Sequence, residues 1–363
     1  MEFDKIDRKL LAELDKDARQ PLSQIARRLG LSQQVVSYRF QRLSDQGLLK
    51  GTLTFINTLR LGFRFYNIYL RLKFMPEDKV SAAIKQLKAM PRVAWLVSLS
   101  GQYNLLVSMI ARDINDFQNQ YNQVLNIMDA SIIDDSVFIV TDGCQLPYPL
   151  LPGQQPELTD KHARVRGEEI TVKDIDLQIM RELSADARIT SLEIAQKIGA
   201  EPATIANRLK LLLKSDLVQG FKPLLDMSKL GKQWYVLLLK LKYVDEPMKN
   251  KFIETMKTLP QTFYVTQGVG NWHMQLEFYC DDDNDWKKVL SHIFPSEHSP
   301  IVKELTEMRI TAEHKCVYYP FDLGNTRQAK LNRWSKEEQW KKPKTQKSKS
   351  STPIIEERPI YAT

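Results

Sequence analysis

Hydrophobic residues recur every three to four positions along the first fifty residues, and this spacing predicts helices. Residues 25–43, IARRLGLSQQVVSYRFQRL, predict a helix, a tight turn and a second helix. Gly30 stands where the first of these helices should end, and Ser32 stands at the expected N-cap of the second. The apolar face of the second helix comprises Val36, Phe40 and Leu43.

The opposite face of this second helix is polar and almost free of acidic residues. It carries Gln34, Tyr38, Gln41 and Arg42, flanked by Gln33, Ser37 and Arg39. Amide, hydroxyl and guanidinium groups form hydrogen bonds with base edges and phosphates in a DNA major groove. An ordinary amphipathic hairpin with a solvated outer face shows the same pattern, so the rest of the chain has to separate the two interpretations.

The hydrophobic period changes near residue 48. LLKGTLTFIN, residues 48–57, predicts strands of a small wing or connecting hairpin. Farther along, alternation predicts four strands and three- to four-residue spacing predicts two helices. In chain order these are strand 65–74, helix 76–90, strands 93–100 and 103–111, helix 113–128 and strand 132–140. This order is the ferredoxin-like β-α-β-β-α-β arrangement.

The whole pattern occurs twice. DKIDRKLLAELDKDAR at 4–19 matches KDIDLQIMRELSADAR at 173–188, and an offset of 169 residues continues through most of the chain. It pairs Gly30 with Gly199 and Arg39 with Arg208. We therefore predict an α+β fold of two tandem modules, each a three-helix helix-turn-helix head followed by a ferredoxin-like β-α-β-β-α-β domain.

These assignments divide the chain into six parts. The predicted boundaries are 1–57 for the first head, 58–146 for the first ferredoxin-like domain, 147–170 for a Pro- and Gly-rich linker, 171–226 for the second head, 227–323 for the second ferredoxin-like domain and 324–363 for a basic, disordered tail.

Positive charge is unevenly distributed along the chain. The formal net charge is +8, but residues 327–363 alone hold ten Lys and Arg against four Glu. In the remainder, basic residues gather between Arg19 and Lys50, where six of them stand against the single acid Asp45. This patch coincides with the helix-turn-helix stretch and favours a nucleic-acid partner.

Composition narrows the other functional classes. No apolar run reaches the ~18 residues that a membrane helix needs, and the start MEFDKIDRK lacks an apolar signal segment. The three cysteines lie far apart without a Cys-x-x-Cys pair, which fits a reducing compartment. No histidine spacing suits a metal, and no nucleophile–base pair or phosphate loop is found. We expect a cytoplasmic protein with no membrane segment, no metal, no cofactor and no catalytic residues.

IDRKLLAEL with DAR, LSQQVVSYRFQRLSDQGLLKG and SGQYNLL together resemble the Lrp/AsnC family, the feast/famine regulators of bacteria and archaea. The resemblance covers both copies and most of residues 4–320. It implies that the heads bind operator DNA and that the ferredoxin-like domains form dimers and larger assemblies that sense amino acids or related molecules. A chain with two modules can pair its own ferredoxin-like domains as an intramolecular pseudo-dimer, or assemble as a homo-oligomer.

The residues expected to contact DNA lie on or beside the second helix of each helix-turn-helix. They are Ser32, Gln33, Gln34, Ser37, Tyr38, Arg39, Gln41, Arg42 and Lys50 in the first head, and Thr204, Asn207, Arg208 and Lys210 in the second. Gln33 or Gln34 can read adenine, whereas Arg42 and Lys50 are expected to hold phosphates. Arg39 and its counterpart Arg208 can hold a phosphate or brace the fold. The second head is less basic, so we expect it to contribute less.

The resemblance also implies a ligand-binding loop in each ferredoxin-like domain. The loop residues are Gly101, Tyr103 and Asn104 in the first, and Gly270, Trp272 and His273 in the second. The family often has Asp at the position of Asn104, so a carboxylate that would accept an amino group's hydrogen bonds is missing from both loops. The alternative interpretation is that the glycines make hairpin turns and the aromatic rings pack.

Two other functions remain open. Sirohaem decarboxylases resemble paired Lrp/AsnC modules, but that resemblance includes a histidine in the strand before the loop, and neither RVAWLVSLS nor TFYVTQGV contains one. A protein that only oligomerises or senses, having lost DNA binding, is disfavoured by the basic patch. The main prediction is a sequence-specific DNA-binding transcriptional regulator of the Lrp/AsnC type. Its predicted partners are double-stranded DNA and a small-molecule effector such as an amino acid.

Overall fold

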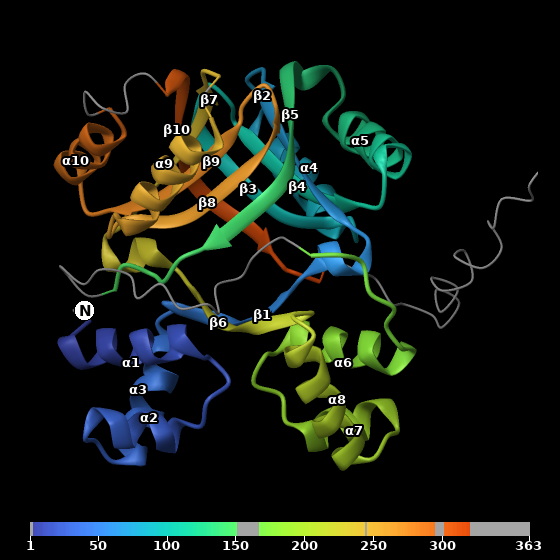
Figure 1. Ribbon diagram of the computed structural model, residues 1–363, viewed down its shortest axis with the longest axis vertical. Coiled ribbons are helices and arrows are strands. Elements are labelled where there is room, and N and C mark those ends of the chain that lie inside the picture. Colours follow the sequence, from blue (N-terminus) through green and yellow to red (C-terminus); the bar gives the residue numbers. More distant parts are fainter. Residues whose placement is uncertain (1–2, 151–166, 244, 295–300, 320–363) are drawn as a thin grey trace, which may run out of the picture. The chain divides into compact units, whose positions relative to one another are not determined.

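The computed structural model describes residues 3–150, 167–243, 245–294 and 301–319, all within one compact unit (Figure 1). Both predicted modules are present, and each has three helices followed by a β-α-β-β-α-β domain. The predicted fold class is therefore confirmed. Most of the predicted linker and the whole predicted tail lie outside the described residues. No helix in the described part is long and apolar enough to cross a membrane.

Each head is a compact group of three helices. They are α1 (Lys5–Lys16), α2 (Leu22–Leu29) and α3 (Gln33–Asp45) in the first head, and α6 (Asp174–Ala185), α7 (Ser191–Ile198) and α8 (Pro202–Lys214) in the second. Gly30 ends α2 with a left-handed backbone, φ 67°, and the side chain of Ser32 accepts a hydrogen bond from the Val35 amide at the start of α3. The turn predicted from these two residues is confirmed.

The strand after each head pairs with its counterpart in the other module. Residues 48–57 form one strand, β1 (Leu49–Ile56), instead of the predicted wing or hairpin, and β1 runs antiparallel to β6 (Val218–Leu225). The predicted wing is wrong because each module supplies a single strand here, so the backbone groups of that strand find partners only across the modules. Helix α1 of the first head contacts β6, and helix α6 of the second head contacts β1 (Figure 1). The first helix of each head therefore packs against the strand that follows the other head.

The ferredoxin-like domains follow short 3-10 turns, η1 (Thr58–Leu61) and η3 (Met227–Leu230). The first domain comprises β2 (Arg64–Leu72), α4 (Glu77–Ala89), β3 (Val93–Gly101), β4 (Leu105–Ala111), α5 (Ile114–Met128), the turn η2 (Asp129–Ser131) and β5 (Ile132–Gln145). The second comprises β7 (Gln233–Leu241), α9 (Glu246–Thr258), β8 (Thr262–Gly270), β9 (Met274–Cys280), α10 (Asp283–Ile293) and β10 (Val302–Cys316).

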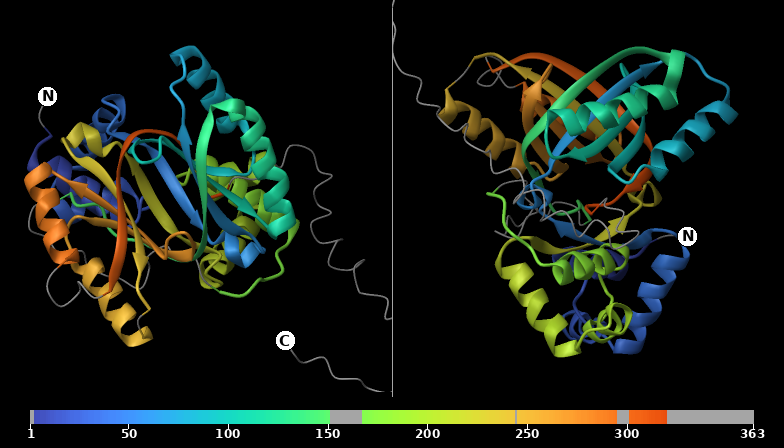
Figure 2. Two further views of the ribbon diagram at one scale, coloured as in Figure 1. Left: turned by 90° about the horizontal axis from the view of Figure 1, so that it is seen from above. Right: turned by 90° about the vertical axis from the view of Figure 1, so that its right-hand side faces the viewer.

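Eight strands of the two domains join in one closed barrel of order β10-β3-β4-β2-β5-β8-β9-β7 (Figure 2). The two joints are β3 with β10 and β5 with β8, so each module completes the sheet of the other. One apolar cluster packs α4 and α5 on the first sheet, and another packs α9 and α10 on the second. A third cluster joins residues of both modules, among them Tyr69, Phe138, Trp272 and Met308. The chain thus pairs its own two ferredoxin-like domains.

Candidate nucleic-acid interface

Helix α3 presents amide and hydroxyl side chains to solvent. Gln33, Gln34 and Gln41 are exposed, and Tyr38 is 68% exposed although it is a large aromatic residue. Gln41 donates from Nε2 to Asp45 Oδ1 over 2.8 Å, one turn farther along the helix. The opposite face is anchored by Val36 and Leu43, which are fully buried, and Ser37 is half-buried at the border. An exposed polar face on a helix with a buried apolar face suits insertion into a groove.

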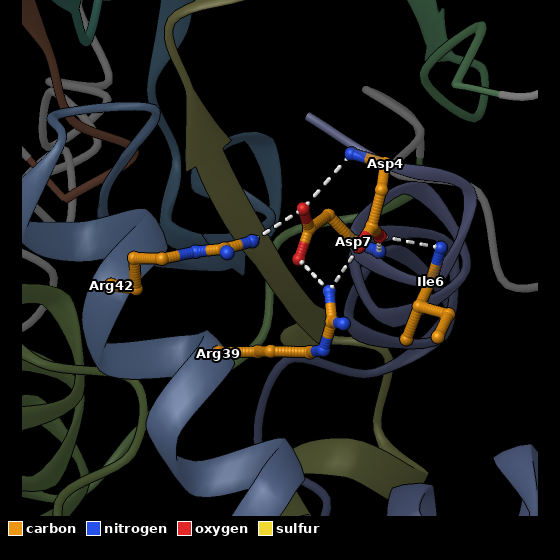
Figure 3. Close-up of polar contacts among 5 residues, drawn as sticks. All are labelled: Asp4, Ile6, Asp7, Arg39 and Arg42. Atoms are coloured by element: carbon orange, nitrogen blue, oxygen red, sulfur yellow. Dashed lines mark hydrogen bonds and ion pairs between the residues drawn. The ribbon is translucent and has the colours of Figure 1, made fainter. Parts of the chain in front are cut away.

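The two arginines of α3 lie against α1 (Figure 3). Arg39 donates from Nη1 to Asp4 Oδ2 at 2.7 Å and to Asp7 Oδ1 at 2.8 Å, and Arg42 donates from Nη2 to Asp7 Oδ2 at 2.5 Å. Asp7 is fully buried, whereas the side chains of Arg39 and Arg42 are 17% and 28% exposed. Hydrogen bonds from Arg39 to Asp4 and Asp7 raise the pKa of Arg39 above its usual value. Both arginines therefore connect α3 to α1, although helical spacing placed Arg42 on the outward face.

The second head repeats this brace with one arginine. Arg208, the counterpart of Arg39, donates from Nε to Asp176 Oδ1 at 2.8 Å and from Nη2 to the other oxygen of the same carboxylate. Asp176 is buried at the place of Asp7. The only arginine that both recognition helices share thus makes the same internal contact in each. The other three residues proposed from sequence on α8 are exposed: Thr204, Asn207 and Lys210.

Lys50 lies at the junction of the first head and the barrel. Its Nζ is 3.4 Å from Oε2 of Glu313 on β10, so its charge is directed toward the barrel. Two further exposed basic residues of this head lie on α2, the helix before α3. Arg27 and Arg28 are both exposed, and Arg28 donates to Glu13 at 2.7 Å. Helical spacing on α3 gave no signal for Arg27, whose position appeared only as part of the basic patch.

The two heads are tied to each other by reciprocal arginine contacts. Arg19 donates from Nη1 to the carbonyl oxygen of Ala187 at 2.5 Å, and Arg188 donates to the carbonyl oxygens of Ala18 and of Gln20. The guanidinium of Arg188 also lies 5.3 Å from the ring centre of Phe40 on α3. Desolvation lowers the pKa of both arginines, as expected for partly buried cations. The DAR triplet in each copy was the sequence signal for this latch.

The two predicted ligand loops take part in the joint between the modules. Tyr103 and Trp272 are buried and contact each other edge-to-face, with ring centres 5.6 Å apart. Asn104 Oδ1 accepts from the Leu72 amide at 2.8 Å, and His273 Nδ1 accepts from the Leu241 amide at 2.9 Å. Asn104 and His273 occupy equivalent positions in the two modules. They accept hydrogen bonds from the amides of the equivalent residues Leu72 and Leu241, at the ends of β2 and β7.

The glycines of these loops allow strands of the two modules to approach closely. A Cβ on Gly101 would lie 2.8 Å from the carbonyl oxygen of Glu307, and a Cβ on Gly270 would overlap the carbonyl oxygen of Val137. Both glycines also have positive φ, 135° and 143°, which disfavours other residues. Gly101 lies where β3 pairs with β10, and Gly270 lies where β8 pairs with β5. The two glycines therefore take part in the pairing of strands between the modules as well as in hairpin turns.

A cavity of about 100 Å³ lies between the β1–β6 ribbon and the barrel. Its lining is rich in aromatic rings and contains the carboxylates of Glu277 and Glu313; none of the described lining residues is Lys, Arg or His. No group of three or more His, Cys, Asp or Glu in the described ranges could hold a metal ion. The cavity therefore differs in character from the polar, basic surface of the first head.

Comparisons with known proteins find a matching family model for each head and for the first half of the barrel. The AsnC-type helix-turn-helix domain matches residues 3–44, the winged helix-turn-helix DNA-binding domain matches 173–219, and the Lrp/AsnC ligand binding domain matches 67–138. The HTH-type transcriptional regulator Ptr1 of Methanocaldococcus jannaschii is 34% identical over 112 residues, which is 31% of this chain and 74% of that protein. The HTH-type transcriptional regulator LrpA of Pyrococcus horikoshii is 30% identical over 127 residues, 35% of this chain and 89% of that protein.

Among solved structures, the siroheme decarboxylase NirDL shares the fold over most of both chains. The TM-score is 0.56, with 91% of this chain and 97% of that chain covered, and the sequences are 12% identical. At this identity the likeness is one of fold alone. The two-module architecture is therefore found in another protein.

Proposed function

This chain belongs to the Lrp/AsnC family, and on that premise we propose that it is a sequence-specific DNA-binding transcriptional regulator that carries a pseudo-dimer in one polypeptide. The observation that carries the proposal is the exposed polar face of α3. Gln33, Gln34, Tyr38 and Gln41 extend from a helix that is held by a buried apolar face and by two internal ion pairs. A rigid helix with exposed amides and an exposed phenol suits direct reading of base edges.

Arg39 and Arg42 pair with acidic residues of the first head, so we assign the phosphate contacts to another residue. These arginines hold α3 in position, and Arg208 does the same for α8. We assign phosphate contacts to the exposed Arg27 near the end of α2, because in helix-turn-helix proteins the helix before the recognition helix crosses the DNA backbone. Phosphate contacts of this kind position the head without specifying sequence.

The reciprocal latch between the heads supports a two-part operator. Arg19 and Arg188 bind backbone carbonyls of the opposite head, so the two recognition helices are held in a fixed relation. Two-fold proteins bind two-fold sites with half-sites one helical turn or multiples of a turn apart. Because α3 and α8 expose different side chains, we propose an imperfect palindrome whose two half-sites differ.

We include a small-molecule effector and further assembly in the proposal, since the family profile for the ligand binding domain matches residues 67–138. On the predicted loops, the exposed Asn104 retains an amide NH₂ group as a donor, because only its Oδ1 is used by the Leu72 amide in the described contacts. Pairing with further copies of the chain would leave the intramolecular barrel intact.

A decarboxylase acting on a tetrapyrrole is less well supported by the residues. Such a substrate carries several carboxylates and needs basic partners, whereas the described lining of the barrel cavity offers Glu277 and Glu313 and no basic side chain. Absorbance spectra of the purified chain with sirohaem, followed by product analysis, separate the two functions, since turnover would contradict the regulator.

The test of the proposed function is selection of DNA fragments by the full chain from a random or genomic library. We expect one enriched motif with two unequal half-sites, and absence of any enriched motif would contradict the proposal. The matched variants Tyr38→Ala and Asn207→Ala alter equivalent positions of the two heads. We expect Tyr38→Ala to lose more specific affinity, and to relax the sequence preference of one half-site only.

A further inference from the structure

The cavity between the ribbon and the barrel contains a buried carboxylate, Glu277, and a partly buried one, Glu313, and each accepts a hydrogen bond from a tryptophan. Glu277 on β9 is 4% exposed, and its Oε2 accepts from Nε1 of Trp234 at 3.1 Å. Glu313 on β10 accepts through Oε1 from Nε1 of Trp95 at 3.1 Å. The ring centres of Trp95 and Trp234 lie 5.8 Å apart, so the two carboxylates are hydrogen-bonded to neighbouring indole rings.

The negative charge of this cavity is only partly compensated. Lys50 approaches Glu313 at 3.4 Å, and Glu277 is held by neutral donors, Trp234 and Gln275, with no ion pair to it among the described residues. Burial raises the pKa of Glu277 to about 7, and the charge on Glu313 adds to that shift. Burying a carboxylate without a cation is costly, so a site of this composition gains from a bound positive charge.

The walls of the cavity suit the same kind of ligand. Trp95, Trp234 and Tyr279 line it together with further aromatic rings. The faces of aromatic rings attract cations, and the attraction is stronger where water is excluded. An ammonium group has three N–H donors and no acceptor. It can therefore donate to the lone pairs of Glu277 that Trp234 and Gln275 leave unused, and to the oxygen of Glu313 that Lys50 approaches.

We propose that this cavity binds a small primary amine that carries no carboxylate. Its ammonium group would lie between Glu277 and Glu313, and its apolar body would lie against Trp95, Trp234 and Tyr279. A free amino acid is disfavoured there, because its carboxylate would lie beside those of Glu277 and Glu313, and the nearby Lys50 is paired with Glu313. The proposed ligand class thus differs from amino acids, and the site is separate from the Gly101 and Gly270 loops.

Lys50 supplies an internal competitor for this site. Its Nζ lies at the long distance of 3.4 Å from Glu313, and its side chain remains 34% exposed. An arriving ammonium group would replace Nζ at Glu313 and release Lys50 at the start of β1, where that strand leaves the first head. Removing the lysine charge should therefore increase the affinity for the amine.

The experiment measures binding to the full chain at pH 8 by calorimetry, with quenching of tryptophan fluorescence as a second readout. The probes are isobutylamine, 2-methylpropan-1-ol as its neutral counterpart, and valine, which adds a carboxylate to the same amine. We expect isobutylamine to bind, and the alcohol and valine to bind at least tenfold more weakly. No binding of isobutylamine, or equal binding of either comparison compound, overturns the proposal.

Variants locate the site and control for folding. Glu277→Gln should weaken isobutylamine binding at least tenfold, whereas Glu304→Gln, an exposed position on β10, should leave it unchanged. Lys50→Met should strengthen binding severalfold, and this result does not depend on changing the cavity wall. Unchanged affinity in both Glu277→Gln and Lys50→Met would place isobutylamine elsewhere and contradict the assignment.

Discussion

Arg39 donates to the buried carboxylate of Asp7 at 2.8 Å, and this contact fastens the recognition helix α3 to α1. The pair of Arg208 with Asp176 fastens α8 to α6 in the same way. The first head adds Arg42 to the same carboxylate, so Asp7 binds two guanidinium groups and Asp176 binds one. The persistence of this arginine in both copies is thereby explained by internal structure, independently of any contact with DNA.

The first prediction concerns the stability of this brace. Asp7→Asn should lower the free energy of unfolding by about 2 kcal/mol, because two partly buried guanidinium groups lose their charged acceptor. Asp176→Asn is the matched control and should cost less, since it leaves one arginine without its partner. Urea unfolding of the full chain gives both values. Equal losses would show that Arg42 adds nothing to the brace.

The second prediction separates positioning from phosphate binding. Arg27→Ala should reduce the slope of log affinity against log salt by about one, because one phosphate contact is lost. Arg42→Ala should leave that slope unchanged while lowering the unfolding free energy, because its guanidinium is used by Asp7. Binding to a selected DNA fragment at several salt concentrations measures both slopes. If Arg42→Ala reduced the salt slope and Arg27→Ala did not, the phosphate contact would belong to Arg42 on α3.

Most of the fold could be predicted from local sequence patterns, but the pairing of strands that lie far apart in the sequence could not. The period of apolar residues and the turn at Gly30 and Ser32 depend on neighbours in sequence, so helices, strands and the repeat were predictable. The pairing of β1 with β6 joins residues about 170 positions apart, and alternation within a strand does not say which strand lies beside it.

The same limit applies to the candidate site. Helical spacing correctly placed Gln34 and Tyr38 outside, but it could not show that Arg42 bends back toward Asp7, 35 residues earlier. Long side chains reach well beyond the face on which their Cα lies. The cavity was also invisible in sequence, because Glu277 and Glu313 come from separate strands and meet only when the barrel closes.

The third prediction concerns the latch between the heads. The double variant Arg19→Ala and Arg188→Ala removes the contacts with the carbonyl oxygens of Ala187 and Ala18, and should let the heads move relative to each other. The native chain should prefer one spacing between half-sites, and the variant should bind spacings altered by a few base pairs with less discrimination. Arg181→Ala, a partly exposed arginine on α6 that pairs only with Glu182 in the described contacts, is the control. An unchanged spacing preference would show that the latch is dispensable.

The last prediction concerns the pH dependence of stability. The pKa of Glu277 is raised from 4.5 to about 7 by burial, so between these values the folded chain binds a proton there that the unfolded chain has released. Folding is therefore favoured by this group below about pH 4.5, and the contribution is lost as the pH rises to about 7. Glu277→Gln removes the titration, so the stability of this variant relative to the native chain should rise by on the order of 2 kcal/mol between pH 5 and pH 8.

Urea unfolding of both proteins at several pH values measures that difference, and taking the difference cancels the titration of groups that do not interact with Glu277. Glu304→Gln, which alters an exposed carboxylate on β10, should run parallel to the native chain. Parallel profiles for Glu277→Gln as well would mean that the carboxyl group is solvated in solution, and the cavity would then lack the buried charge on which amine binding depends. A divergence confined to pH 5–7 would identify Glu277 as the group, because burial raises its pKa from 4.5 to about 7.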